Sequence, residues 1–357
     1  MAPLVIELKR NPHYDVRLVS SGQHRDLVAD TLRAFQLGVD VDCSVMTPNQ
    51  TLEELTARLF SALGGLLKAE RPDLVIAQGD TTTVLVSSMV CFYQSIPFGH
   101  LEAGLRSGEL CTPFPEEMNR RVCSVLSQLH FAPTTAARDN LLAERVPSER
   151  ISVTGNTVID ALLAMSQLSP APPIRVSPDR RVILLTAHRR ENFGAPHLSV
   201  FRAVRKLVRQ FPDVEVIYPV HPNPNVLGPA QRELSGEDRI HLAAPFGYQD
   251  LVATMMQSTV ILTDSGGIQE EAPALGKPVV ILREQTERPE IVTSGAGILC
   301  GTDEDTIVRE CSRLLSEPAY YQAHVIGYSP VGDGQASRRV AEAVQSFFAG
   351  ALETVSR

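Results

Sequence analysis

Three carboxylates in the first half of the sequence have the types and spacing for acid–base chemistry. Asp80 follows the apolar segment 74–77, Glu102 follows a second such segment at 97–101, and Glu116 opens a predicted helix. Groups that follow the strands of a parallel sheet gather at one edge of it, so we expect the three carboxylates to converge. Their mutual repulsion would raise the pKa of at least one, leaving a group that exchanges protons near neutrality. Such a set suits proton transfer on a sugar ring.

The second half contains a segment suited to binding an anion. Residues 260–280 have the pattern of a short strand, a tight turn, a helix beginning near Gly267 and a second strand. Ser265, Gly266 and Gly267 let the backbone approach a ligand, and free N–H groups there can hold phosphate oxygens. Glu271 lies further along the helix, where its carboxylate can accept hydrogen bonds from sugar hydroxyls.

Cationic side chains follow other predicted strands. Those that we expect to contact an anionic substrate are Arg106, Arg120, His188, Arg189, His221 and Arg288. Cations beside glycine-backed N–H groups match a pyrophosphate, while adjacent carboxylates match ribose or sugar hydroxyls.

Each candidate also has a simpler explanation. Asp80 and Ser265 can be ordinary helix caps, and Glu116 can merely favour a helix dipole. The segment 186–194 can be a solvated basic turn, and His221 can pack its own loop. The residues by themselves leave both interpretations open.

The elements that must position these side chains alternate between strand and helix. Strands are predicted at 16–20, 74–77, 97–101, 129–132, 182–186, 214–219, 240–242, 260–263 and 278–282. Helices are predicted at 2–10, 26–37, 51–69, 82–92, 119–127 and 335–348, with another ending at Met165. This alternation is typical of an α/β fold with mostly parallel sheets and ligands at the C-terminal ends of the strands.

A proline-rich stretch at 169–173 separates two such alternations. We therefore predict two similar α/β domains, residues 1–165 and 166–340, facing one another across a cleft. The final helix, at about residues 341–357, is expected to pack back on the first domain.

Composition excludes several classes of protein. The 357 residues are 43% hydrophobic and 21% charged, the balance of a soluble globular protein of about two domains. A net charge of -8 argues against a nucleic-acid partner. No apolar run approaches a membrane span and no signal peptide is evident, so we expect a cytoplasmic protein without a membrane partner.

No metal or cofactor is expected. The six cysteines form no C-x-x-C pair, so neither a zinc site nor a disulfide framework is indicated, and most are expected to be reduced and buried. Clustered metal ligands, a G-x-x-x-x-G-K-[ST] loop and a G-x-G-x-x-G fingerprint are all missing from the sequence.

A series of segments resembles the motifs of the non-hydrolysing UDP-N-acetylglucosamine 2-epimerases. In chain order they are QGDTTT (78–83), GHLEAGLRSG (99–108), PEEMNR (115–120), TAHRREN (186–192), TDSGGIQEEAP (263–273), TERPE (286–290) and GDGQAS (332–337). They keep the family's order over nearly the whole chain, which makes the resemblance specific.

The resemblance implies a GT-B-like pair of Rossmann-like domains and a homodimer. It also implies reversible conversion of UDP-N-acetylglucosamine to UDP-N-acetylmannosamine, through elimination of UDP to 2-acetamidoglucal and its re-addition, for cell-surface polysaccharide synthesis. The matching catalytic positions are Asp80, Glu102, Glu116 and His188. The positions that resemble the UDP-holding residues are His188, Ser265, Gly266, Gly267, Glu271 and Arg288.

The sequence also departs from the family pattern. Relatives open with a strand and a Gly-Thr-Arg-Pro-Glu loop that would precede Met1, so we expect a misassigned translation start or a truncated chain. Gln23 and His24 resemble part of a second, activating substrate site of bacterial members. Asp26 and Asn49 stand where that pattern commonly has glutamine and arginine, which leaves retention of the activation open.

Three alternatives share parts of this pattern. A GT-B glycosyltransferase would share the UDP site but commonly needs only a single base. A hydrolysing epimerase would share the glycal step but release UDP and free N-acetylmannosamine. A chain without catalytic activity would still bind the nucleotide sugar.

Overall fold

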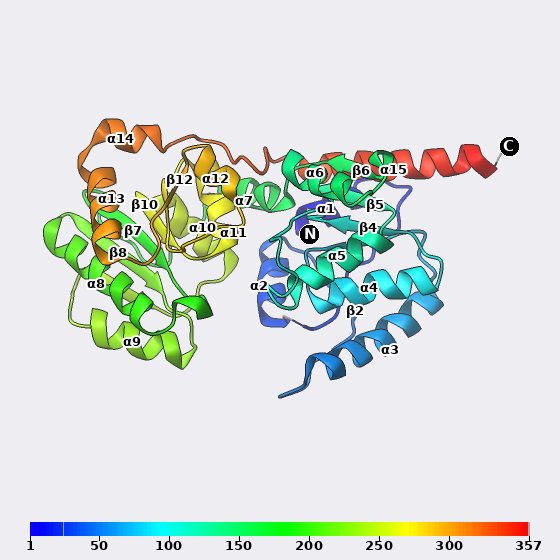
Figure 1. The fold of residues 1–357 in the computed structure, drawn as a ribbon, viewed down its shortest axis with the longest axis horizontal. Helices are drawn as coiled ribbons and strands as arrows, with labels where there is room; N and C mark the ends of the chain where they lie inside the picture. Colours follow the sequence, from blue (N-terminus) through cyan, green and yellow to red (C-terminus); the bar gives the residue numbers. More distant parts are fainter. Residues whose placement is uncertain (24, 356–357) are drawn as a thin grey trace. The chain divides into compact units, whose positions relative to one another are not determined.

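The computed structural model of the protein describes residues 1–23 and 25–355 and divides into two compact units (Figure 1). Unit 1 comprises Met1–Ala161 and Gly334–Arg357, and unit 2 comprises Leu162–Asp333. Both are built from alternating strands and helices, as the sequence pattern predicts.

Unit 1 contains a four-stranded parallel sheet in the order β3-β4-β5-β6. Its strands are β3 (Val75–Gln78), β4 (Phe98–Leu101), β5 (Leu129–Ala132) and β6 (Ile151–Val153). A separate two-stranded parallel sheet pairs β1 (Val19–Ser20) with β2 (Val41–Asp42). The helices of unit 1 are α1 (Ala2–Lys9), α2 (Arg25–Ala34), α3 (Leu52–Glu70), α4 (Thr82–Tyr93), α5 (Glu116–Leu126), α6 (Thr135–Ala143), η1 (Ser148–Arg150), the start of α7 (Thr157–Gln167) and α15 (Ala336–Val355).

Local sequence explains the longest helix of the first half, α3. The Thr51 hydroxyl accepts the Glu54 N–H while the Glu54 carboxylate accepts the Thr51 N–H, a capping box that fixes the start. Buried leucines then recur every four residues and point to one side, so the helix packs through one apolar face. These leucines are Leu55, Leu59, Leu63 and Leu67.

Unit 2 contains a six-stranded parallel sheet in the order β12-β11-β10-β7-β8-β9. Its strands are β7 (Arg181–Thr186), β8 (Val214–Pro219), β9 (Ile240–Ala243), β10 (Val260–Thr263), β11 (Val279–Ile281) and β12 (Gly297–Leu299). Its helices are the rest of α7, η2 (Arg190–Asn192), α8 (Ala195–Gln210), α9 (Pro224–Leu234), α10 (Tyr248–Gln257), α11 (Gly266–Glu271), η3 (Ala272–Leu275), α12 (Pro289–Thr293), α13 (Glu304–Ser316) and α14 (Pro318–Ala323). This is the doubly wound Rossmann order, in which the direction of strand addition reverses between β7 and β10.

Most predicted strands occur within one residue of their expected bounds, and the exceptions are short edge elements. The predicted strand at 16–20 is paired only at Val19–Ser20. The two- and three-residue strands β2, β6 and β12 were not predicted, because so few residues give too weak a pattern.

The final helix belongs to unit 1. Val340 and Val344 of α15 share a buried apolar cluster with Leu4 and Leu8 of α1. Asp160 on α7 caps α15 by accepting the N–H groups of Ala336 at 3.2 Å and Ser337 at 2.7 Å.

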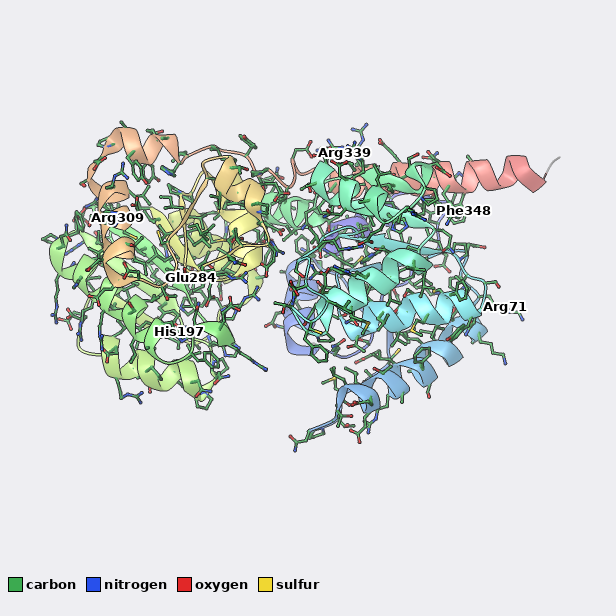
Figure 2. The ribbon with its side chains drawn as sticks, in the orientation of Figure 1. Arg71, His197, Glu284, Arg309, Arg339 and Phe348 are labelled. Atoms are coloured by element: carbon green, nitrogen blue, oxygen red, sulfur yellow. The ribbon has the colours of Figure 1, made fainter. Side chains whose placement is uncertain are left out.

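A second contact holds the same helix. Arg339, labelled in Figure 2, donates from Nη1 to the Thr154 carbonyl at 3.1 Å.

In the part of the chain that the structure describes, no helix is both long enough and apolar enough to span a membrane.

Two glycines in the loop after β4 give a test of the packing in unit 1. Gly104 and Gly108 both have a positive φ, +87° and +89°, so alanine at either position is strained by about 1–2 kcal/mol. A Cβ at Gly104 would also lie 2.1 Å from the Ala137 carbonyl oxygen, whereas a Cβ at Gly108 meets nothing within 4 Å. In urea unfolding, Gly104→Ala should therefore lose roughly 1–3 kcal/mol more than its control Gly108→Ala. Equal losses would contradict the close helix–loop packing.

Candidate functional site

Asp80 and Glu102 lie in loops at the same edge of the unit 1 sheet. Asp80 follows β3 and Glu102 follows β4, and these strands are parallel neighbours with Gln78 opposite Leu101. Gln78 Nε2 donates to Glu102 Oε1 at 3.0 Å, which joins the two loops directly. Glu102 has a φ of +64°, an uncommon conformation for a residue other than glycine that often marks a functional site.

Helix α5 brings a cation to Asp80. Arg120 Nη2 lies 2.6 Å from Asp80 Oδ2, and Asn119 Nδ2 donates to the Asp80 carbonyl at 2.7 Å. The predicted repulsion among carboxylates is therefore offset at Asp80 by a buried guanidinium. Spacing in the sequence did not reveal this ion pair, because its partners are 40 residues apart.

His100 forms a hydrogen bond with Gly79, the residue between β3 and Asp80. This imidazole is completely buried and its Nε2 donates to the Gly79 carbonyl at 2.7 Å. Burial lowers the pKa of His100 to about 4, so the ring is neutral at pH 7. It supports the backbone as a hydrogen-bond donor rather than as a charge.

Glu117, which has no assigned role in the sequence pattern, organises the start of α5. Its fully buried carboxylate pairs with Arg121 at 2.9 Å and Arg120 at 3.4 Å, and it accepts the Ser107 N–H at 3.1 Å. Glu116, the predicted acid–base residue beside it, is partly exposed at the first helical position. The two neighbouring glutamates thus differ in their surroundings: the carboxylate of Glu117 is buried in ion pairs that hold the fold, whereas that of Glu116 is partly exposed.

Arg106 makes its contacts within unit 1. Its guanidinium is buried and forms two hydrogen bonds with Glu144, both at 2.7 Å, and others with Ser124 Oγ and the Leu105 carbonyl. These contacts fix the loop that follows Glu102. They describe a residue that holds the fold, and a ligand contact by Arg106 stays a prediction.

The predicted anion-binding residues of unit 2 lie at the point where strand order reverses. His188 and Arg189 follow β7, and Ser265 to Gly267 follow β10, the parallel neighbour of β7. In open α/β sheets this crevice outside the carboxyl ends of the strands is where ligands bind.

Asp264 joins these two loops. Its Oδ2 accepts the backbone N–H groups of His188 at 2.9 Å and Arg189 at 2.8 Å, and Asn192 Nδ2 at 3.2 Å. The sequence gives no sign of this, because an aspartate in such a turn ordinarily caps the following helix.

Gly266 lies close against the guanidinium of Arg288. A Cβ at Gly266 would lie 3.0 Å from the Arg288 guanidinium carbon, whereas a Cβ at Gly267 meets nothing within 4 Å. Arg288 is held over the turn by Glu270, with Nε to Oε1 at 2.7 Å. The missing side chain at Gly266 thus allows a cation to lie against the turn.

Glu271 is a buried carboxylate beside another. Burial raises its pKa to about 8 and the neighbouring Glu270 contributes in the same direction, while a hydrogen bond from Tyr248 opposes the shift. Tyr248 Oη donates to Glu271 Oε1 at 2.8 Å, which fixes one carboxyl oxygen. The other oxygen remains as the group that could accept from a ligand hydroxyl.

The imidazoles of His188 and His221 stack on each other. Their ring centroids are 5.7 Å apart with 17° between the planes. Burial lowers the pKa of His188, Asp264 opposes this, and His221 and Arg189 add to the lowering. His221 Nδ1 accepts the Asn223 N–H at 3.1 Å, so a proton on its neutral ring lies on Nε2.

A further histidine, His197, lies on α8 and is labelled in Figure 2. It is buried between the rings of Phe193 and Phe201, with centroid distances of 5.6 and 5.7 Å. Burial lowers its pKa. The sequence pattern gave it no role, and its surroundings are those of a core residue.

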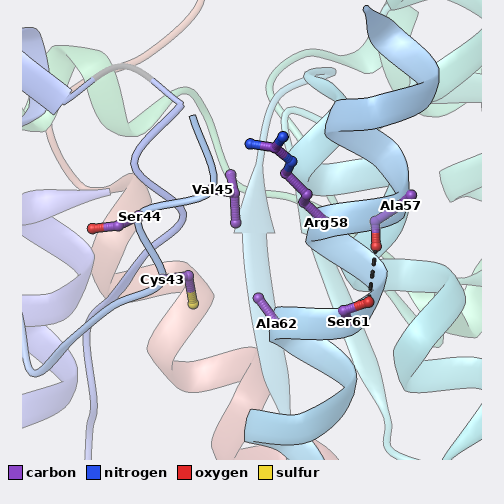
Figure 3. Close-up of a pocket in the computed structure, with 7 residues that line it drawn as sticks. All are labelled: Cys43, Ser44, Val45, Ala57, Arg58, Ser61 and Ala62. Carbon is purple, nitrogen blue, oxygen red and sulfur yellow. Dashed lines mark hydrogen bonds between the residues drawn. The ribbon is translucent and has the colours of Figure 1, made fainter. Parts of the chain in front are cut away.

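Of the predicted regulatory pair, Gln23 is described and His24 lies outside the described residues. Gln23 Oε1 accepts from Thr83 Oγ1 at 2.6 Å. Residues 43–45 line an open pocket (Figure 3). They pair with the segment that precedes Gln23, because the Val45 N–H donates to the Ser21 carbonyl at 3.0 Å. The lining residues are Cys43, Ser44, Val45, Ala57, Arg58, Ser61 and Ala62.

Comparison with known proteins gives one consistent result. A sequence model of the family described as UDP-N-acetylglucosamine 2-epimerase matches residues 6–345. The chain is 46% identical to a UDP-N-acetylglucosamine 2-epimerase from Bacillus subtilis, covering 96% of this chain and 90% of the relative. It is 44% identical to one from Escherichia coli, covering 97% and 95%.

Solved structures agree with the sequence relatives. The UDP-GlcNAc 2-epimerase from Neisseria meningitidis, in a crystal structure with bound UDP-GlcNAc, is 42% identical and has a TM-score of 0.90. That likeness covers 97% of this chain and 96% of the other.

The buried Glu271 predicts a particular dependence of stability on pH. The unfolded chain releases this proton near 4.5 and the folded chain near 8, so the native state binds more protons in between and loses stability as pH rises through that range. Glu271→Gln removes this loss. Its thermal unfolding midpoint should therefore rise relative to the original chain between pH 5 and 8. The exposed carboxylate variant Asp305→Asn is the control, and a constant difference for Glu271→Gln across this range would contradict the assignment.

Proposed function

The chain belongs to the UDP-N-acetylglucosamine 2-epimerase family, and we propose that it interconverts UDP-N-acetylglucosamine and UDP-N-acetylmannosamine without net hydrolysis. The observation that carries the proposal is the pair of carboxylate loops joined by the Gln78–Glu102 hydrogen bond, with Arg120 against Asp80. A UDP-binding turn explains unit 2 but is equally expected of a glycosyltransferase. Two adjoining acid–base loops are what an epimerase needs in addition.

The reaction requires two events that assist each other. The hydrogen on sugar carbon 2 is removed as a proton while the bond from carbon 1 to the diphosphate breaks, giving 2-acetamidoglucal and UDP. A diphosphate oxygen then bonds again to carbon 1, and a proton is delivered to the opposite face of carbon 2. Because carbon 2 is not next to a carbonyl, a base alone faces a steep barrier and the departing diphosphate must be stabilised.

In this scheme Asp80, Glu102 and Glu116 exchange the protons. The strained backbone of Glu102 and its hydrogen bond from Gln78 support a carboxylate held in one orientation. The ion pair with Arg120 holds the Asp80 carboxylate in one position, which suits a base.

Unit 2 holds the UDP part of the substrate. The backbone N–H groups of Gly266 and Gly267 and the guanidinium of Arg288 contact the diphosphate, since Arg288 already lies over the turn. The Ser265 N–H donates to Thr263 Oγ1 at 2.9 Å, so Ser265 contacts the ligand through its hydroxyl. Glu271 accepts from ribose hydroxyls through the oxygen that Tyr248 leaves free.

The basic and imidazole groups of the β7 and β8 loops complete the diphosphate site. His188, Arg189 and His221 neutralise the leaving group, His188 acting directly on its oxygens. The stacked rings and the Asp264 hydrogen bonds support a fixed geometry for these loops.

We further propose a cytoplasmic homodimer whose product feeds cell-surface polysaccharide synthesis. Gln23 and His24 are proposed to contribute to a second substrate site. The neighbouring pocket is lined in part by Arg58, whose guanidinium supplies a positive charge for an anionic ligand. Activation of the reaction by added UDP-N-acetylglucosamine would be the kinetic sign of that site.

An NMR experiment tests the reaction. The protein is incubated with UDP-N-acetylglucosamine in deuterium oxide, and the sugar resonances are followed. We expect UDP-N-acetylmannosamine to form and deuterium to enter carbon 2 of both epimers. Free N-acetylmannosamine would instead identify a hydrolysing enzyme, and an unchanged sugar would refute the proposed activity.

Two variants separate chemistry from binding. Asp80→Asn and Glu102→Gln should each lower the rate of deuterium entry by about 10²–10⁴-fold, the range for lost acid–base groups. UDP affinity, measured by calorimetry, should stay within a few-fold of the original chain. Asp139→Asn, an exposed carboxylate of the same unit, is the control. Wild-type rates in both site variants would remove these residues from the catalytic set.

Alanine variants of Gly266 and Gly267 distinguish a shift of Arg288 from a direct block of the proposed UDP site. Gly266→Ala displaces Arg288, whereas the methyl group of Gly267→Ala enters open space that the proposed UDP would occupy. Both should weaken UDP binding by about tenfold or more. Only Gly266→Ala should also lower thermal stability in the absence of UDP. If Gly267→Ala binds UDP normally, the turn is not in contact with the nucleotide.

A further inference from the structure

Asp264 is a buried carboxylate in an unusual environment. Its side chain is fully buried, and Oδ2 accepts two backbone N–H groups and the amide of Asn192. Within the described ranges its ion-pair partner is His188, with Nδ1 to Oδ1 at 3.6 Å. Burying an ionised group costs free energy that a neutral side chain would avoid. A negative charge at this position therefore points to a task beyond holding the loop.

The position of Asp264 in the sheet indicates the task. It follows β10, and its own N–H donates to the Thr186 carbonyl at the end of β7 at 3.1 Å. The residue thus lies at the parallel pair β7 and β10, where the direction of strand addition reverses. Its side chain accepts hydrogen bonds from the loop after β7, and its backbone leads into the loop after β10. Both loops carry residues of the proposed diphosphate site.

We propose that Asp264 is the positioning residue of His188: it fixes the imidazole from behind and balances the positive charge that this ring acquires when a sugar nucleotide diphosphate binds. The inference rests on the proposed function and assigns part of its binding mechanism. Oδ1 is directed at the Nδ1 side of the ring, which leaves Nε2 as the nitrogen available to the ligand. The stacked His221 ring limits rotation of His188.

The charged and titratable groups around His188 determine when it is protonated. Burial lowers its pKa, Asp264 raises it, and His221 and Arg189 lower it further. His197 interacts with both Asp264 and His188 and is itself held towards its neutral form by burial. Without ligand the ring is therefore mainly neutral at pH 7. The added negative charge of a diphosphate favours the imidazolium, so binding takes up a proton.

Calorimetry in several buffers measures this proton. UDP-N-acetylglucosamine is titrated into the protein at pH 7 in buffers of different ionisation enthalpy, and the dependence of the heat on the buffer gives the number of protons exchanged. The diphosphate diester of the ligand does not titrate near pH 7, so uptake comes from the protein. We expect an uptake of up to about one proton per site.

Two isosteric variants isolate the charge of Asp264. Asp264→Asn keeps an oxygen that can accept the His188 and Arg189 N–H groups but removes the charge; it should bind about tenfold more weakly and take up almost no proton. Asp160→Asn is the matched control, because Asp160 is also buried and accepts two backbone N–H groups, those of Ala336 and Ser337 in unit 1. It should keep both the affinity and the uptake. A folded Asp264→Asn protein with unchanged affinity and proton uptake would overturn the inference.

A measurement on the unmodified chain decides the matter even if Asp264→Asn does not fold. The ¹³Cε1 resonance of His188, assigned by its loss in His188→Gln, should move towards the imidazolium position when UDP-N-acetylglucosamine is added at pH 7. A ring that stays neutral in the complex refutes the inference while leaving the proposed function intact. If the unmodified protein neither binds nor converts the sugar nucleotide, the proposed function fails first.

Discussion

Parallel pairing between neighbouring strands is the constraint on which both halves of this protein depend. Strands that run in the same direction place all their carboxyl ends, and the loops that follow them, at one edge of the sheet. Pairing of β3 with β4 brings the Asp80 and Glu102 loops together, and pairing of β7 with β10 does the same for the loops of His188 and Ser265. Chemistry-bearing residues that are far apart in the chain become neighbours for this reason.

Hydrogen bonds and ion pairs hold the charged side chains of these clusters. Arg120 pairs with Asp80, while backbone and amide N–H groups donate to Oδ2 of Asp264. At Glu271 the hydrogen bond from Tyr248 only partly offsets burial, which with the neighbouring Glu270 raises its pKa to about 8. Each arrangement lowers the freedom of a side chain that the proposed reaction needs in one orientation, which is the structural form of electrostatic preorganisation.

The epimerase assignment and the physical description support each other at different levels. Membership of the family rests on nearly the whole chain, whereas the division of labour between the units rests on individual contacts. Unit 1 has the joined carboxylate loops, and unit 2 has the glycine turn with its overlying guanidinium. A leaving diphosphate and a proton-accepting carboxylate are the two requirements of an elimination, and the chain supplies residues suited to each.

The sequence by itself determined the alternation of strands and helices, the Ser265–Gly267 turn and the candidate carboxylates, because these depend on local patterns of apolar residues and glycine. Tertiary structure alone decided that Arg120 neutralises Asp80, that Gly266 makes room for Arg288 and that Asp264 holds His188. The partners in these contacts lie 40, 22 and 76 residues apart. Such contacts depend on which strands pair and on where each loop lies in the folded protein. A sequence pattern that extends over a few residues carries no information about either.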